Sequence, residues 1–326
     1  MSLLDSLAQS VTPDMLGSLG KSLGMDSATV KKGMDVVAPL LQGGLANASK
    51  TPQGLDSIMK MLPADTSSLS GILQSFTGGG NADAISGLVQ SAFGDGSSAI
   101  TKTLSGKLGF NVAPLVATAV PALLAMVSKT AKEKKLDANG VATMLQDESK
   151  AFMDKGGPTA DLIKEATSAG QQANTLKQKF SADEWVKVRL APVAAAGLVV
   201  AASPSGATGL AQEVAAGTAA VAAARDAAGA VSVLSMAFNT DFSTDELRKF
   251  GKDTPKSVVL SALRDAVATV AAKNPADVAA YRAMLMGVGT KVAEAAKEGG
   301  FLGIGGTQVS DAERAALAEL KAAIGA

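Results

Sequence analysis

Apolar residues recur at three- and four-residue spacing along most of this 326-residue chain, which is the period of a helix with one buried face. In the stretch 181–209, Val186, Leu190, Val193 and Val200 follow this spacing, and beyond Arg189 the opposite face is also apolar, mostly alanine. A helix that is apolar on all sides is buried in a core or a membrane. We therefore expect the chain to be organised around this segment, whose helix ends at Ser203-Pro204-Ser205-Gly206.

Helix starts recur along the chain with a consistent chemistry. A serine followed three residues later by glutamate, the capping box, occurs at Ser181, Ser243 and Ser310. A capping side chain followed by proline, which suits the first helical position, occurs at Thr12, Thr51, Thr254 and Asn274. Sustained strand alternation is missing, and alanine, the best helix former, dominates the second half. These patterns predict an all-α fold, with Pro192 expected to kink the helix that starts at Ser181.

Residues 1 to about 150 show an internal duplication. Leu23-Gly24-Met25, which precedes a long apolar segment, is echoed by Leu108-Gly109-Phe110. Pro39-Leu40-Leu41 is echoed in the same way by Pro121-Ala122-Leu123-Leu124. Repeated helical units that bury one another's apolar faces explain such a pattern.

The best domain boundary is Lys155-Gly156-Gly157-Pro158, where two glycines and a proline stop the preceding helix. We expect two helical domains: a duplicated helical domain at 1–155 and an Ala-rich helical bundle at 180–326. Between them, residues 156–179 are polar and helix-prone and are interpreted as a connecting helix or hairpin, interrupted near Gly170.

The first half resembles a known family. The opening MSLLDSLAQ, the Leu23-Gly24-Met25 turn, the stretch GMDVVAPLLQGGLANASKTPQGLDSIMKML at 33–62 and the duplication are similar to the bacterial YidB-like family of small helical proteins. The resemblance covers about residues 1–150. It implies an all-helical fold and no established activity, so no functional residue is carried over. The second half is only loosely similar to uncharacterised bacterial helical proteins.

Composition excludes several kinds of chemistry. The chain carries 30 Lys and Arg against 30 Asp and Glu, so its formal net charge is zero, and nucleic-acid binding, which depends on a basic excess, is not expected. It contains no cysteine and no histidine, which removes imidazole bases, activated thiols and the softer metal ligands. We assign no catalytic, cofactor-binding or metal-binding residues, and expect no cofactor and no enzymatic activity.

Two features that resemble sites have simpler structural interpretations. The acid pairs Asp183-Glu184 and Asp245-Glu246 fall in first helical turns, where carboxylates stabilise the helix dipole. The glycine-rich run 299–306 lacks the strand and the spacing of a dinucleotide-binding loop. We interpret that run as a plug whose apolar side chains fill the bundle, while its glycines supply a permissive backbone.

Charged residues near the alanine-rich helices are a further candidate for buried pairs. The cations are Lys187, Arg189 and Arg225, and the anions are Glu213 and Asp226. Because charged side chains are rarely buried, solvated helix faces are the preferred interpretation.

Two stretches, 108–128 and 190–212, lack charge for long enough to span a bilayer. Prolines interrupt both, and neither has an aromatic belt in a chain with 3% aromatic residues. Buried core helices are the preferred interpretation, and no integral membrane span is expected. The N-terminus carries Asp5 and lacks the cationic start of a secretory signal, so we expect a cytoplasmic protein.

Three classes of function remain open. The first is a non-enzymatic protein that acts through protein–protein contacts, as an adaptor, an assembly component or a homo-oligomer. The second is a bundle that binds a small ligand or a lipid, in one version at a membrane surface, with a pocket near Trp185. The third is an enzyme that uses only carboxylates, lysine or a bound metal. The scarcity of catalytic side chains and the abundance of Ala and Gly favour the first.

Overall fold

The structure is a computed structural model that describes residues 2–63, 82–203, 206–251, 253–295 and 309–326. The described residues form α-helices and short 3-10 turns without any strand, so the expected all-α class is confirmed. Contacts divide the chain into two compact units, Met1–Gln171 and Gln172–Ala326. The division falls inside α10 (Pro158–Gln178), within the expected connector 156–179, whose limits stay a prediction.

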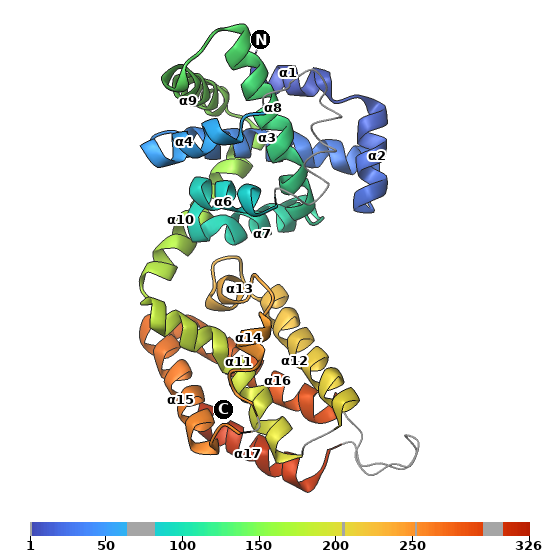
Figure 1. The fold of residues 1–326 in the computed structure, drawn as a ribbon, viewed down its shortest axis with the longest axis vertical. Coiled ribbons are helices and arrows are strands. Elements are labelled where there is room, and N and C mark those ends of the chain that lie inside the picture. The colour runs from blue at the N-terminus through green and yellow to red at the C-terminus, as the bar shows by residue number, and fades with distance from the viewer. Residues whose placement is uncertain (1, 64–81, 204–205, 252, 296–308) are drawn as a thin grey trace. The chain divides into compact units, whose positions relative to one another are not determined.

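The described part of unit 1 consists of helices (Figure 1). Its elements before α10 are α1 (Leu3–Ser10), α2 (Pro13–Leu23), α3 (Ser27–Ala48), α4 (Pro52–Met61), α6 (Ala82–Phe93), the 3-10 turn η1 (Gly94–Gly96), α7 (Ser97–Leu108), α8 (Ala113–Glu133) and α9 (Ala138–Lys155). The two long apolar helices α3 and α8 pack against each other, and α1, α2, α6 and α9 lie around them.

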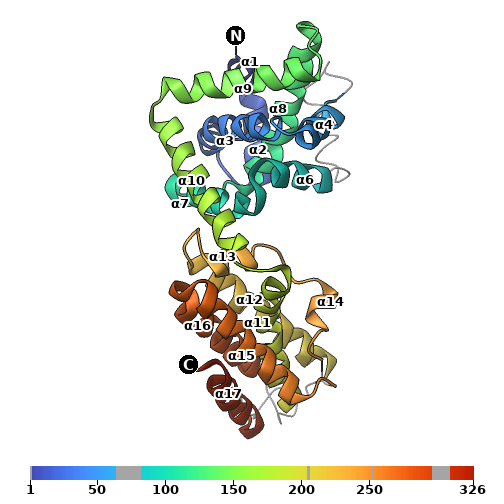
Figure 2. The ribbon, with the colours of Figure 1, turned by 90° about the vertical axis from the view of Figure 1, so that its left-hand side faces the viewer.

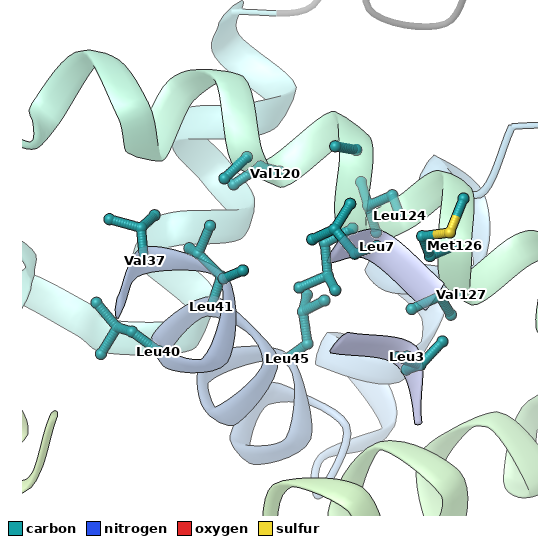
Figure 3. Packing of buried hydrophobic residues seen from close by; sticks show 14 of the residues in the cluster. Leu3, Leu7, Val37, Leu40, Leu41, Leu45, Val120, Leu124, Met126 and Val127 are labelled. Atoms are coloured by element: carbon teal, nitrogen blue, oxygen red, sulfur yellow. The ribbon is translucent and has the colours of Figure 1, made fainter. Parts of the chain in front are cut away.

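The core of unit 1 lies where α1, α3 and α8 meet. In the view of Figure 3, Leu7 of α1 lies near Leu124 of α8, and Leu3 of α1 lies near Val127 of α8. Leu45 of α3 belongs to the same cluster of buried residues. Burying one such leucine contributes about 1.5–3 kcal/mol, so this cluster holds the N-terminal helix in place.

A polar contact adds to the anchoring of α1. The Glu148 carboxylate accepts hydrogen bonds from the backbone N–H of Leu3 at 2.7 Å and from Nε2 of Gln42 at 3.1 Å. The same carboxylate thereby links α9 to the start of α1 and to the middle of α3.

Unit 1 contains two helical segments with the same order of features. In the first, α2 ends at Gly24 with φ 66° and leads into α3, which contains Pro39. In the second, α7 ends at Gly109 with φ 82° and leads into α8, which contains Pro121. Glycine adopts these left-handed conformations without steric cost, which explains its place at both helix ends.

Unit 2 is organised around α11 (Ala182–Ala202), which contacts every other α-helix that lies wholly within the described part of this unit. The expected central segment 181–209 thus supplies the central helix of unit 2. The others are α12 (Ala207–Ala227), α13 (Val233–Ala237), α14 (Thr244–Leu247), α15 (Lys256–Lys273), the 3-10 turn η2 (Pro275–Asp277), α16 (Val278–Ala295) and α17 (Asp311–Ile324). Figure 2 shows α11, α15 and α16 side by side, with α17 next to α15.

The proline inside α11 has a specific partner. Pro192 has no N–H, so the carbonyl of Val188, four residues earlier, loses its helical hydrogen bond. Tyr281, the only tyrosine of the chain, is fully buried, and its hydroxyl donates to this carbonyl at 2.7 Å. The helix runs through Pro192 from Ala182 to Ala202 as one element.

Most expected helix starts are present. Ser181, Ser243 and Ser310 form complete capping boxes, and Thr12 and Thr51 cap their helices. The caps expected at Thr254 and Asn274 are wrong. The helix α15 starts after Pro255 and has no side-chain cap. Asn274 precedes the turn η2, and its side-chain amide donates to Asp277.

The expected interruption near Gly170 is also wrong, because α10 continues through it. A Cβ at Gly96 would lie 2.2 Å from the Gly170 carbonyl oxygen. These glycines therefore permit a close approach of two backbones, and Gly170 does not end its helix.

Two helices of the described part of the chain, α8 and α11, are long and apolar enough to cross a membrane by length and composition. The core helix of a soluble protein passes the same test. The most apolar window of α8 is 61% buried in the structure and that of α11 is 44% buried, so α11 has the less covered surface of the two.

Candidate functional site

A cavity of unit 2 lies beside the less covered face of α11. It has a volume of about 440 Å³, within the roughly 300–1,000 Å³ typical of small-molecule sites. Its walls come from α11, α12, the segment 242–251 that includes α14, and Val288 of α16. The partly exposed residues Ala196, Gly197 and Val200 of α11 are among those that line it, so the uncovered face of the central helix is the cavity wall.

The lining is almost entirely apolar. From α11 it includes Pro192, Val193, Ala196, Gly197 and Val200, from α12 Leu210, Val214, Gly217, Thr218 and Val221, and from 242–251 Phe242, Thr244, Leu247, Arg248, Phe250 and Gly251. Leu210 is 44% exposed and Val214 is 37% exposed. The cavity is therefore an apolar hollow with part of its α12 wall open to solvent.

Glycine brings the segment 242–251 close to α11. A Cβ at Gly197 would lie 2.5 Å from the carbonyl oxygen of Phe250, a distance that requires the backbone to move. On the opposite wall, a Cβ at Gly217 would lie 3.2 Å from Cγ2 of Val292, so α12 and α16 are also in close contact there. Small residues thus set the separation of the walls.

Arg189 of α11 contacts the N-terminal part of the segment 242–251. Its guanidinium donates to the Glu246 carboxylate, with Nε–Oε1 at 2.5 Å, and to the carbonyls of Ala237 and Asp241, each at 2.7 Å. It also lies 5.0 Å from the ring centre of Phe242, which lines the cavity. One side chain therefore ties the loop after α13 and the helix α14 to the central helix.

The ion pair is substantially shielded from solvent. The side chain of Arg189 is 15% exposed and that of Glu246 is 27% exposed. The hydrogen bond from Arg189 lowers the pKa of Glu246 from 4.5 to about 2, with a further contribution from the Ser243 backbone N–H. Glu246 forms the expected capping box with Ser243 and also pairs with Arg189.

The preferred interpretation of Arg189 as part of a solvated face is therefore wrong. Its partner is Glu246, and neither Glu213 nor Asp226 was the correct candidate. Arg225 pairs with its neighbour Asp226, and Lys187 is exposed. Sequence reasoning missed the pairing because nothing local relates two residues 57 positions apart.

Trp185 does not line this cavity. Its ring meets that of Phe180 edge to face, with centroids 5.2 Å apart, and the Lys177 ammonium lies 4.3 Å from the ring centre. Trp185 precedes Pro192 by seven residues, or about 10 Å along a helix. The cavity beside α11 therefore lies about two turns further along the helix than the position near Trp185 at which a pocket is expected.

Other candidate features have structural roles or fall outside the described residues. Glu184 accepts from the backbone N–H of Ser181, which lowers the pKa of this glutamate, and pairs with Lys273. The glycine-rich run at 299–306, with Phe301, Leu302 and Ile304, lies outside the described residues. Across the described ranges, no group of three or more acidic side chains is placed to hold a metal ion.

Unit 1 contains a smaller cavity of about 230 Å³ between α1, α2 and α3, with Phe152 of α9 at its edge. Its lining is also mainly apolar, and Lys31 and Asp35 at its edge pair with each other at 2.8 Å. This cavity is below the usual size of a small-molecule site.

Comparison with known proteins bears on unit 1 alone. Residues 5–115 match a family described as a bacterial protein of unknown function (DUF937). The expected resemblance of the N-terminal region is thereby confirmed, over a shorter range than the expected 1–150. No curated protein and no solved structure matches the chain. The DUF937 match ends before α11, so it carries no information on the unit 2 cavity.

Proposed function

We propose that this chain is a non-enzymatic binding protein whose second unit holds a largely hydrophobic small molecule in the cavity beside α11. The observation that carries the proposal is the cavity itself, about 440 Å³ in volume and lined by apolar side chains on α11, α12 and the segment 242–251. Apolar hollows with a few polar groups are the usual form of small-molecule sites. Burying one methylene group there contributes about 0.8 kcal/mol before the costs of binding.

Filling the cavity provides the test. Ala196→Phe places a ring against the lining of α11, and Ala223→Phe places the same ring on an exposed position of α12 outside the lining. With ANS as a fluorescent probe and dodecanol as its competitor, we expect the wild type and Ala223→Phe to bind dodecanol alike. We expect Ala196→Phe to bind at least tenfold more weakly.

Two results would contradict the proposal. One is no dodecanol binding by the wild type, and the other is unchanged affinity in a folded Ala196→Phe variant. Far-UV circular dichroism checks folding, and Val214→Gln, at a partly exposed lining position, serves as a second variant if Ala196→Phe does not fold.

Protein–protein contact is the second candidate. Leu210 and Val214 expose apolar surface at the same cavity, and such surface marks interaction sites when it is contiguous. Under this proposal, sedimentation shows association that rises with concentration and that Val214→Glu abolishes. A strict monomer that captures no partner in a pull-down counts against it.

A further inference from the structure

We propose that the unit 2 cavity binds a single-chain carboxylate, such as a fatty acid, with the carboxylate at Arg248 and the alkyl chain along α11 and α12. This inference rests on the proposed function and specifies its ligand. It follows from the shape of the lining and from the placement of charge within it.

The lining is elongated. On α12 it runs from Leu210 to Val221, eleven residues or about 16 Å of helix, and on α11 from Pro192 to Val200, about 12 Å. The lining therefore extends along both helices far enough to contact a ligand of that length. An extended alkyl chain is an elongated ligand of this kind, and it makes apolar contacts along its entire length.

A single charged residue, Arg248, lines the cavity. The other polar side chains of the lining are Thr218 and Thr244, and the Thr218 hydroxyl donates to the carbonyl of Val214 at 2.9 Å. A ligand charge at this site therefore meets a cation and no lining carboxylate. The charge complementarity selects an anionic head group.

Glu246, two residues before Arg248, already has its partners. Glu246 is bound by Arg189 and by the Ser243 backbone, while the ion pairs found among the described residues do not involve Arg248. Arg248 is exposed at the C-terminal end of α14. Its planar guanidinium can donate two parallel hydrogen bonds to a carboxylate, and this geometry favours a carboxylate over a neutral hydroxyl.

The test compares two ligands of equal chain length, laurate and dodecanol, both below the concentration at which they aggregate. Binding is measured by displacement of ANS from the full chain. We expect laurate to bind the wild type about fivefold more tightly than dodecanol, because the site adds one partly solvated ion pair, for which about 1 kcal/mol is typical.

Arg248→Gln should remove that preference, so that this variant binds laurate and dodecanol with equal affinity. Lys249→Gln removes the adjacent exposed cation, which does not line the cavity, and should keep the preference. Arg248→Lys retains the positive charge and should keep part of the preference for laurate. This variant also serves as the test if Arg248→Gln does not fold.

The outcomes separate the two proposals. Equal affinities for laurate and dodecanol in the wild type, or an equal loss in Lys249→Gln and Arg248→Gln, overturn the assignment of the head group while the apolar site stands. A wild type that binds neither ligand overturns the proposed function and this inference together.

Discussion

Replacing Glu246 by glutamine removes one charge from the contact that ties the segment 242–251 to α11, and it keeps the size of the side chain. Arg189 and Glu246 are 15% and 27% exposed, so solvent screens their attraction only in part. The stabilisation follows from the pKa of Glu246, which falls from 4.5 in the unfolded chain to about 2 in the folded one.

The sign of this effect follows from proton linkage. A carboxyl group whose pKa is lowered by folding stabilises the fold above its unfolded pKa, and it loses that contribution as pH falls through its folded pKa. At about 1.4 kcal/mol per pKa unit, the contribution of the charge is about 3 kcal/mol at pH 7, about 1 kcal/mol at pH 3 and less than 1 kcal/mol at pH 2. The window of loss therefore runs from about pH 4.5 down to about pH 2.

Urea unfolding monitored by tryptophan fluorescence measures the free energy of unfolding of unit 2, since Trp185 is the only tryptophan of the chain and lies in this unit. We expect Glu246→Gln to lower the free energy of unfolding of unit 2 by about 3 kcal/mol at pH 7 and by about 1 kcal/mol at pH 3. Asp241→Asn is the control, because it removes a nearby exposed carboxylate and keeps the backbone carbonyl that Arg189 binds; its expected effect is within about 0.5 kcal/mol.

The reasoning is refuted if Glu246→Gln is equally destabilised at pH 7 and pH 3, since the loss would then come from packing. It is also refuted if Asp241→Asn is as unstable as Glu246→Gln, which would point to the general charge of the loop.

Two further predictions concern the central helix. Tyr281→Phe removes the hydroxyl that donates to the buried carbonyl of Val188 at 2.7 Å. This substitution should lower the free energy of unfolding by about 1–3 kcal/mol. No change in urea unfolding would show that the hydroxyl does not replace the hydrogen bond lost at Pro192. Gly197→Ala brings a Cβ to 2.5 Å from the Phe250 carbonyl oxygen and should destabilise unit 2 by about 1–3 kcal/mol. Gly287→Ala, in α16 with nothing within 4 Å of the added Cβ, should instead stabilise by about 0.5–1 kcal/mol; equal effects of the two substitutions would contradict the close approach at Gly197.

The sequence by itself determined which parts of the chain are helical and where most helices begin. Capping boxes such as the one at Ser181 and glycine ends such as Gly24 and Gly109 depend on residues one turn apart, so the local chain contains all the information they need. The central position of α11 within unit 2 was also predictable, because its apolar faces must be covered by other helices.

Only the tertiary structure decided which distant residues meet. Arg189 and Glu246 are 57 positions apart, and Tyr281 and Val188 are 93 apart. Considered alone, each of these residues fits an ordinary structural role: Arg189 that of a solvated cation, Glu246 that of a helix cap, and Tyr281 that of a core aromatic. The cavity beside α11 belongs to the same class of feature: it exists where four segments of the chain fail to fill a volume, and no local pattern encodes a volume shared by distant segments.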